Sequence, residues 1–177
     1  NAGLKVGAAK VTGTGSGRDT WLMTDAGSKV TLDFTHAGYP STYLATPEQI
    51  DGIIETLVAH LSLAKVDAIV IEVADGLLQS ETAALLDSKV FSRTIDSIIF
   101  AAGDAMGAAA GIECLQKKNL PVAAVSGRLT ASPLAIIETG KITGMPVLDK
   151  AALSSETIAE VLQISSRMRG IRNVAAR

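Results

Sequence analysis

Short apolar runs alternate along this chain with segments of helical periodicity, and this alternation restricts its fold more than any other feature. The run DAIVIEVA is apolar almost throughout, which is typical of a strand covered on both faces. Strands and helices in alternation pair in parallel through right-handed crossovers, so we expect an α/β fold, three layers with a mostly parallel sheet. The expected strands span residues 4–12, 29–34, 67–74, 97–102 and 120–125, with a shorter candidate at 145–148.

The clearest helix signal begins at Thr46, which is a good N-cap because Pro47 can occupy the first helical position and Gln49 can complete a capping box. Apolar residues then recur on one stripe up to Leu61. Further helices are expected over residues 104–119, 131–141 and 155–169. A globular chain of 177 residues buries about 69% of its unfolded surface, so one domain over residues 1–177 is expected.

Composition excludes several classes of protein. Apolar residues make up 47% and charged residues 19%, which argues against disorder, and no apolar run reaches the ~18 residues of a membrane span. The net charge of −2 is dispersed, so neither nucleic acid nor a membrane is an expected partner. The single cysteine, Cys114, excludes an intramolecular disulfide framework and suits a reducing cytoplasm.

Polar residues and glycines follow five successive expected strands. In open parallel sheets, ligands bind beyond the carboxyl ends of the strands, so these residues are candidates for one shared ligand edge. Taken singly, each of them is also an ordinary turn residue. They are Lys10, the segment 12–17, Asp33 with Thr35, Glu72 with Asp75 and Gly76, Gly103 with Asp104, and Ser126 with Gly127 and Arg128.

The segment VGAAKVTGTGSGRDTW places a glycine-rich turn after the first expected strand. Glycines let backbone amides approach a ligand and a following helix adds its positive end, so the segment favours a phosphate or carboxylate. It is not a P-loop signature, because GTGSGRDT is one residue short and has Arg18 where a lysine is required.

Glu72 ends the run of Ile69, Val70 and Ile71, where a carboxylate can hold Mg²⁺ directly or through water. Asp33, at the end of the preceding expected strand, is a second candidate ligand. An ion pair of Glu72 with Lys10 or Arg18 explains the same residue without a metal, and we weigh the two alternatives equally.

The loop THAGYPSTY carries two of the six aromatic residues of the chain. Its rings and hydroxyls are suited to the rim of a small-molecule pocket, although they could also simply cover the end of the sheet. With the strand ends, the loop completes the set of nucleotide- or substrate-binding candidates: Thr12, Gly13, Thr14, Gly15, Gly17, Arg18, Asp33, Ser41, Thr42, Tyr43, Asp104, Ser126, Gly127 and Arg128.

The segments GAAKVTGTG and IEVADG resemble the second strand and the "VVEGAGG" segment of dethiobiotin synthetase-like P-loop NTPases. The turn at 104–107, the segment 120–128 and the segment GMPVL follow the order of that group's C-terminal half, so the resemblance covers about residues 4–150. The "K.TGTG", "DFT.AG.PSTY" and "E.ADGL.Q.ET" segments are similar to a bacterial family of this type, more distantly similar to D-glutamate N-acetyltransferase-like proteins.

This resemblance implies ATP and Mg²⁺ as cofactors and nucleotide-dependent action, as a ligase or transferase, on a small carboxylate-bearing molecule. It assigns the catalytic positions to Lys10, as a substrate or phosphate contact, and to Glu72, as the Mg²⁺-linked carboxylate. It places Ser126 and Gly127 near the adenine.

The chain departs from the group in lacking the first strand and Walker A loop, which should precede Leu4 and lie in the sheet between segments 67–74 and 97–102. Three explanations are open: the chain is part of a longer protein, the sheet closes without that strand, or another chain, such as a second copy, covers the gap. We favour the first and expect this polypeptide not to hydrolyse ATP by itself.

Two other classes of function remain open. The first class is a Rossmann dinucleotide-binding module. Its fingerprint is imitated by the first expected strand, the motif Gly13-x-Gly15-x-Gly17 and Asp33 at the end of the second expected strand, although residues 18–25 make a poor crossover helix. The second class is a non-catalytic interaction domain. The C-terminus could dock an acidic partner, because it carries Arg167, Arg169, Arg172 and Arg177 with no acid after Glu160.

Overall fold

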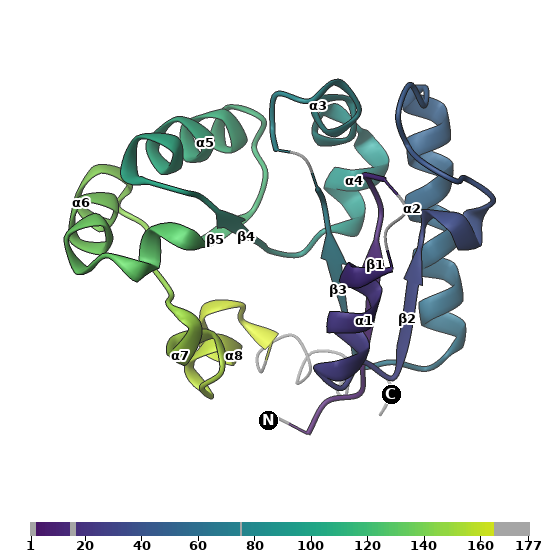
Figure 1. The fold of residues 1–177 in the computed structure, drawn as a ribbon, viewed down its shortest axis with the longest axis horizontal. Coiled ribbons are helices and arrows are strands. Elements are labelled where there is room, and N and C mark those ends of the chain that lie inside the picture. Colours follow the sequence, from purple (N-terminus) through teal and green to yellow (C-terminus); the bar gives the residue numbers. More distant parts are fainter. Residues whose placement is uncertain (1–2, 15–16, 75, 165–177) are drawn as a thin grey trace, which may run out of the picture. The chain divides into compact units, whose positions relative to one another are not determined.

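The computed structural model describes residues 3–14, 17–74 and 76–164. They form two compact units, one from Gly3 to Thr94 and one that begins at Ile95 (Figure 1). The expectation of one domain therefore stays a prediction. None of the described helices is both long and apolar enough to cross a membrane.

The first unit is built on a parallel sheet of strand order β2-β1-β3. Its strands are β1 (Val6–Lys10), β2 (Val30–Asp33) and β3 (Ala68–Glu72), each within the range expected from the sequence. Four of the five β1 residues are buried, which agrees with a central strand covered on both faces. The parallel α/β architecture of this unit is therefore confirmed.

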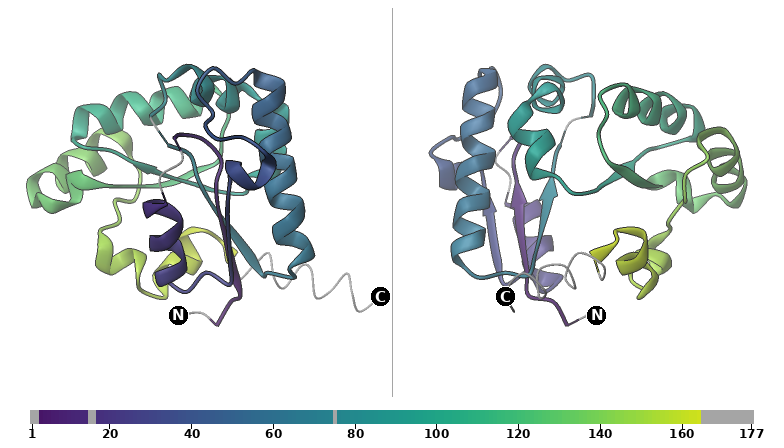
Figure 2. Two further views of the ribbon diagram at one scale, coloured as in Figure 1. Left: turned by 45° about the vertical axis from the view of Figure 1, so that its right-hand side comes forward. Right: turned by 180° about the vertical axis from the view of Figure 1, so that it is seen from behind.

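Two helices cover opposite faces of this sheet. The chain passes from β1 to β2 through α1 (Arg18–Asp25) and returns past β1 to β3 through α2 (Pro47–Leu63). Because the two crossovers run in opposite directions and both are right-handed, their helices lie on opposite faces. Figure 2 shows α1 and α2 on different sides of β1.

The sequence-based judgement that residues 18–25 make a poor crossover helix was wrong. They form α1, which connects two parallel strands, although none of its residues is buried. In its first turn, the Gly17 carbonyl accepts from the Trp21 amide at 3.1 Å and from the Thr20 hydroxyl at 3.0 Å. The prediction failed because it relied on apolar periodicity, which a loosely covering helix does not need.

Helix α2 forms as the sequence predicts. The Thr46 hydroxyl accepts from the Gln49 amide, and the Gln49 side chain accepts from the Thr46 amide at 2.8 Å, so the capping box is complete. The helix packs closely on β1 because a Cβ at Gly7 would meet Leu61 Cδ2 at 3.0 Å. Its fully buried stripe consists of Ile50, Ile53, Ile54, Leu57 and Leu61.

Two short helices, α3 (Ser80–Asp87) and α4 (Lys89–Thr94), follow β3 and were not predicted. Gln79 caps α3 by accepting from the Thr82 amide at 2.9 Å. Within the described residues, β3 is an edge strand of its sheet, and Val70 at its centre is 56% exposed. The expected further strand beside this segment remains a prediction.

The second unit has its own parallel pair, β4 (Ile98–Ala101) and β5 (Val122–Ser126). The short candidate at 145–148 forms one parallel bridge, between Val147 and Val125. Its helices are α5 (Ala105–Lys117), α6 (Pro133–Thr143), α7 (Lys150–Leu153) and α8 (Thr157–Val161).

The core of the second unit lies between its sheet and α5. Ala108, Ile112, Val125 and Leu129 are buried together there, and α5 approaches so closely that a Cβ at Gly111 would fall 2.2 Å from the ring of Phe100. Only a residue without a side chain allows this approach.

Two expected helices of the second unit have different limits in the structure. Helix α6 begins at Pro133 because Ser132 caps it, two residues after the expected start. The continuous helix expected over 155–169 is wrong in its described part, since α8 ends at Val161 and Gln163 has a left-handed φ of 53°. The four C-terminal arginines lie outside the described residues.

Candidate functional site

The last residues of β2, β1 and β3 form one row at the carboxyl edge of the sheet. Lys10 pairs in register with Asp33 on one side and with Glu72 on the other. In-register residues of parallel strands point to the same face of a sheet, so a cation lies between two acids. We call this row, with the loops that follow the three strands, the rim.

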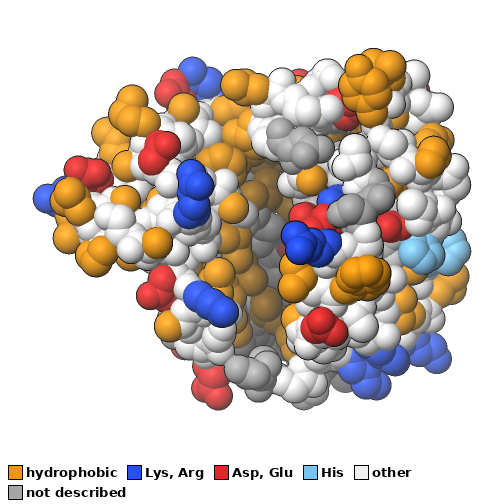
Figure 3. Space-filling model, viewed as in Figure 1, with side chains coloured by type: hydrophobic (Ala, Val, Ile, Leu, Met, Phe, Trp, Pro, Cys, Tyr) orange, Lys and Arg blue, Asp and Glu red, His pale blue; other side chains and the backbone are white. Residues whose placement is uncertain are grey.

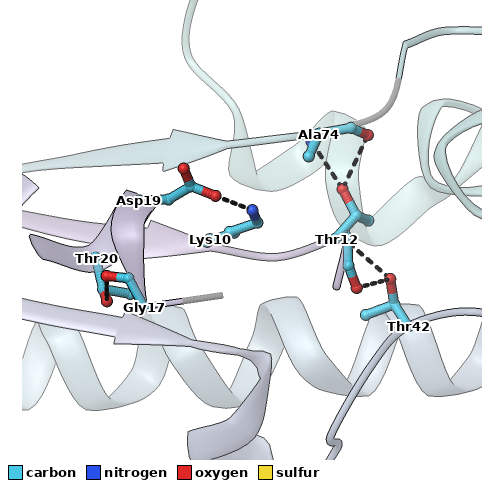
Figure 4. A network of polar contacts seen from close by, with 8 residues as sticks. Lys10, Thr12, Gly17, Asp19, Thr20, Thr42 and Ala74 are labelled. Atoms are coloured by element: carbon cyan, nitrogen blue, oxygen red, sulfur yellow. Dashed lines mark hydrogen bonds and ion pairs between the residues drawn. The ribbon is translucent and has the colours of Figure 1, made fainter. Parts of the chain in front are cut away.

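Lys10 is the buried cation of the rim, with only 7% of its surface exposed. Its Nζ forms an ion pair with Asp19 of α1 (Figure 4), and a Cβ at Gly13 would lie 3.4 Å from the same Nζ. The lysine therefore sits beneath the glycine loop. Asp19 provides an ionic partner that the sequence analysis had not considered.

Thr12 ties the loop after β1 to the loop after β3 (Figure 4). Its buried Oγ1 accepts from the amide of Ala74 at 2.9 Å and donates to the carbonyl of the same residue at 3.3 Å. The Thr82 hydroxyl of α3 donates to that carbonyl as well, at 2.8 Å. The loop after β1, the loop after β3 and helix α3 thus meet at the backbone of Ala74.

At Gly13, the first residue of the glycine motif, both the amide and the carbonyl are bonded within the chain. The amide of Gly13 donates to Thr42 Oγ1 at 2.8 Å, and the Gly13 carbonyl accepts from the Thr42 amide at 3.1 Å. Gly13 has a φ of 120°, which favours glycine. The Gly13 amide is therefore occupied by Thr42, and the prediction that the glycine-rich segment binds an anion stays a prediction.

The rest of the glycine segment leads into α1. Gly17 is the N-cap of α1, and no described side chain caps this helix; the indole of Trp21 packs over Gly17. Arg18 is exposed on the first turn. Gly15 lies outside the described residues, so its predicted role is untested.

The loop predicted as a pocket rim does meet the glycine loop. Ser41 forms a bridge with Thr14, and Thr42 is buried against Gly13, whereas the side chain of Tyr43 is 73% exposed. The alternative that the aromatic residues cover the sheet holds for Phe34, which is fully buried.

A small recess lies where these loops meet. Its volume is about 60 Å³, room for about two waters, whereas pockets for drug-sized ligands span about 300–1,000 Å³. It can therefore receive one end of a ligand and not a whole nucleotide. The recess is lined by Gly13, Thr14, Thr42, Tyr43 and Gln79.

Glu81 is a residue of this region that sequence reasoning missed. Its side chain is buried and accepts from the Ser80 hydroxyl at 2.7 Å, the Leu44 amide at 2.5 Å and the Gln79 side chain. The hydrogen bond from Ser80, and those from backbone amides, lower the pKa of Glu81 although burial opposes this. The available signal was the segment "E.ADGL.Q.ET", in which Glu81 is the third acid, after Glu72 and Asp75.

Asp33 caps the turn that follows β2. Its Oδ1 accepts from the Thr35 amide at 3.0 Å and contacts His36 Nδ1 at 2.9 Å, which caps the 3-10 helix η1 (Phe34–Ala37). Burial raises the pKa of Asp33, but the hydrogen bonds from Thr35 and His36 lower it further, so the net shift is downward.

The paired metal ligands expected at Asp33 and Glu72 lack support in this geometry. The two residues are separated by β1, which puts their backbones about 10 Å apart. No group of three or more His, Cys, Asp or Glu side chains suited to a metal occurs among the described residues. Glu72 alone still fits Mg²⁺, which often binds through one carboxylate, waters and substrate phosphates.

The remaining candidates lie in the second unit, at the carboxyl edge of β4 and β5. Asp104 caps α5 by accepting from the Gly107 amide at 2.7 Å, and Ser126 donates to the Leu148 carbonyl at 2.6 Å. Gly127 has a φ of 101°, and a Cβ at Gly103 would lie 3.6 Å from Arg128 Nη2. These four candidates lie at the carboxyl edge of their own sheet, and the prediction that they share one ligand edge with the rim is untested.

Charges of both signs are mixed at the rim. Among the described residues of the rim and of the first turn of α1, two cations, Lys10 and Arg18, accompany three acids, Asp19, Asp33 and Glu72. Figure 3 likewise shows acidic and basic side chains beside one another over α1. Such a surface suits a ligand of low net charge, such as a nucleotide whose phosphates carry Mg²⁺, better than a free polyanion.

Comparisons with known proteins support the fold and leave the activity open. No protein family and no curated protein matches the sequence. Among solved structures, the chain is similar to the signal recognition particle 54 kDa protein of Aeropyrum pernix K1 in complex with GDP, with 15% identity and a TM-score of 0.56. The match covers 98% of this chain and 43% of that one, so the chain spans less than half the length of this relative.

At this identity the likeness concerns the fold alone. The fold is α/β with a parallel sheet and is P-loop NTPase-like, as predicted from the sequence. The narrower resemblance to dethiobiotin synthetase-like and D-glutamate N-acetyltransferase-like proteins has no support from sequence comparison.

Proposed function

We propose that this chain is the nucleotide-binding-type part of a P-loop NTPase-like protein that acts with Mg·ATP on a small carboxylate-bearing molecule. The rim after β1, β2 and β3 would be its ligand edge. The observation that carries the proposal is the row of Asp33, Lys10 and Glu72 beneath the glycine loop. This row lies where the crossovers to α1 and α2 diverge, the usual ligand position in doubly wound sheets.

Each residue of the row has a distinct part in this proposal. Lys10 would bind a phosphate or carboxylate oxygen after partial release from Asp19. Glu72 would hold Mg²⁺ through one carboxylate, and the metal would screen the phosphate charge. Asp33 would keep η1 and the following loop in place through its cap.

Binding of Mg·ATP by the wild-type chain is the first expected result. A ligand at 100 times its dissociation constant raises the free energy of unfolding by about 2.7 kcal/mol, which a thermal-shift assay detects. The panel should include Mg·ATP, Mg·GTP, NAD and a small dicarboxylate such as malonate. Protection by NAD alone would favour the Rossmann alternative, which the β1-α1-β2 unit with Asp33 at its end also fits.

Lys10→Met should weaken binding of Mg·ATP at least tenfold, because it removes the buried cation and keeps most of the side-chain volume. The double variant Lys10→Met/Asp19→Asn removes both charges of the ion pair and so separates binding from the cost of an unpaired Asp19. Isothermal titration calorimetry measures both dissociation constants.

Lys29→Met is the matched control, because Lys29 is exposed just before β2, at the opposite end of the strands from the rim. It should bind as the wild type does. Unchanged affinity in the Lys10 variants, or no protection of the wild type by any ligand of the panel, would contradict the proposal.

A further inference from the structure

The buried carboxylate of Glu81 connects α3 to the loop that borders the recess. Only 3% of the residue is exposed. One oxygen accepts from the amide of Leu44 at 2.5 Å, and the other accepts from Ser80 Oγ at 2.7 Å and from the side chain of Gln79. Ser80 and Gln79 therefore orient the carboxylate, and its remaining oxygen faces the Leu44 amide.

Leu44 adopts a backbone conformation that its own side chain does not favour. Its φ is 61°, in the left-handed region, where residues other than glycine are uncommon. Its side chain is 75% exposed, so burial of that side chain does not hold the conformation. The hydrogen bonds around the residue must do so: Leu44 to Glu81, and the Ala45 amide to the Thr42 carbonyl at 3.0 Å.

The loop that contains Leu44 also holds the glycine loop, through Thr42, which lies two residues before Leu44. Thr42 is buried and bonds to both the amide and the carbonyl of Gly13, and a Cβ at Gly13 would touch the Lys10 side chain. A continuous set of contacts therefore runs from Glu81 through Leu44 and Thr42 to Gly13. Tyr43 lies within it and lines the recess.

We infer that Glu81 is a positioning residue of the rim: its carboxylate holds the segment from Thr42 to Leu44 in place and thereby fixes Gly13 and Tyr43 at the recess. Glu81 acts through the backbone of Leu44 and does not line the recess itself. The part of this inference that concerns ligand affinity rests on the proposed function, whereas the part that concerns the loop does not.

Hydrogen exchange of individual amides, measured by NMR on the whole chain, tests the loop. Glu81→Gln keeps the size of the side chain but weakens its hydrogen bonds, and should accelerate exchange at Leu44 and Gly13 at least tenfold. Exchange at Leu57 in the buried stripe of α2 should stay within twofold of wild type, which a general loss of stability would not allow.

Two further variants keep the test decisive if Glu81→Gln folds poorly. Ser80→Ala removes one donor to the carboxylate and should accelerate the same amides by a smaller factor. Leu44→Gly keeps the backbone amide and its hydrogen bond while removing the unfavourable side chain. Hydrogen exchange of the amide at position 44 should therefore remain slow. Unchanged exchange at Leu44 and Gly13 in both the Glu81 and the Ser80 variants would overturn the inference.

Affinity for Mg·ATP provides the second readout. Glu81→Gln should raise the dissociation constant of Mg·ATP about tenfold, and Leu44→Gly should leave it within threefold. Faster exchange with unchanged affinity would overturn the role of Glu81 in ligand positioning. If the wild type does not bind Mg·ATP, the proposed function fails, while the exchange rates still decide whether Glu81 holds the loop.

Discussion

Gly127→Ala is expected to destabilise the second unit by about 3 kcal/mol or more. A Cβ at this position would lie 2.6 Å from both the amide nitrogen and the carbonyl oxygen of Ala102. These are backbone atoms of a neighbouring strand end, and they bond to Ser126 and Leu129, so they cannot move without separating β4 from β5. The collision adds about 1–3 kcal/mol, and the backbone conformation of φ 101° and ψ −167°, which is almost exclusive to glycine, adds about 1–3 kcal/mol.

Gly144→Ala is the control for the backbone part of this cost. Gly144 ends α6 with a φ of 66°, and a Cβ there would meet nothing within 4 Å. It should therefore lose only about 1 kcal/mol. Urea unfolding followed by far-UV circular dichroism compares the two variants, and equal losses would show that the close approach to Ala102 is unimportant.

This expectation changes how Gly127 is interpreted as a candidate binding residue. Its lack of a side chain is fully explained by the approach of β5 to Ala102, without any ligand. Loss of binding in Gly127→Ala would therefore reflect misfolding of this edge. Arg128, which is exposed beside Gly103, is the informative position for a ligand at the second unit.

The sequence was sufficient to predict features that rest on local signals or on the rules of parallel sheets. The capping box at Thr46 and the apolar stripe of α2 are local, and both are confirmed. The row of Lys10, Asp33 and Glu72 follows from parallel pairing alone, because parallel strands end at the same edge.

Features that depend on tertiary partners escaped prediction. Helix α1 buries no residue and lacks the apolar stripe by which helices are recognised, and α3 depends on a cap from Gln79. The role of Glu81 requires knowing that Leu44 lies beside it, 37 residues away in sequence. The partner of the Gly13 amide escaped prediction for the same reason, because it is Thr42, 29 residues away in sequence.

The structure also favours the plainer of two alternatives for Asp33. A carboxylate after a strand can bind a metal or cap the next turn, and sequence alone does not distinguish these uses. Here Thr35 and His36 occupy Oδ1. For Lys10, an ion pair with Asp19 is present, a partner that pattern analysis could not place beneath the glycine loop.

Thr12→Val is expected to lower the free energy of unfolding of the first unit by about 2 kcal/mol. Valine has nearly the same shape, but it removes the hydroxyl that accepts from the Ala74 amide and donates to its carbonyl. Because Thr12 is 1% exposed, water cannot easily replace the lost acceptor, and such losses cost about 1–3 kcal/mol. Urea unfolding followed by the fluorescence of Trp21, the only tryptophan, measures the change.

Thr31→Val is the matched control, because Thr31 lies in β2 and, among the described residues, its hydroxyl accepts from that of Thr24 at 3.2 Å, an exposed contact. Valine is favoured in strands, so this variant should stay within about 0.5 kcal/mol of wild type. A double-mutant cycle with Thr82→Val tests the shared carbonyl of Ala74: two hydroxyls that bind one oxygen should not contribute additively. Strict additivity, or equal losses in the Thr12 and Thr31 variants, would mean that Thr12 does not join the two loops and that the rim is held by the strands alone.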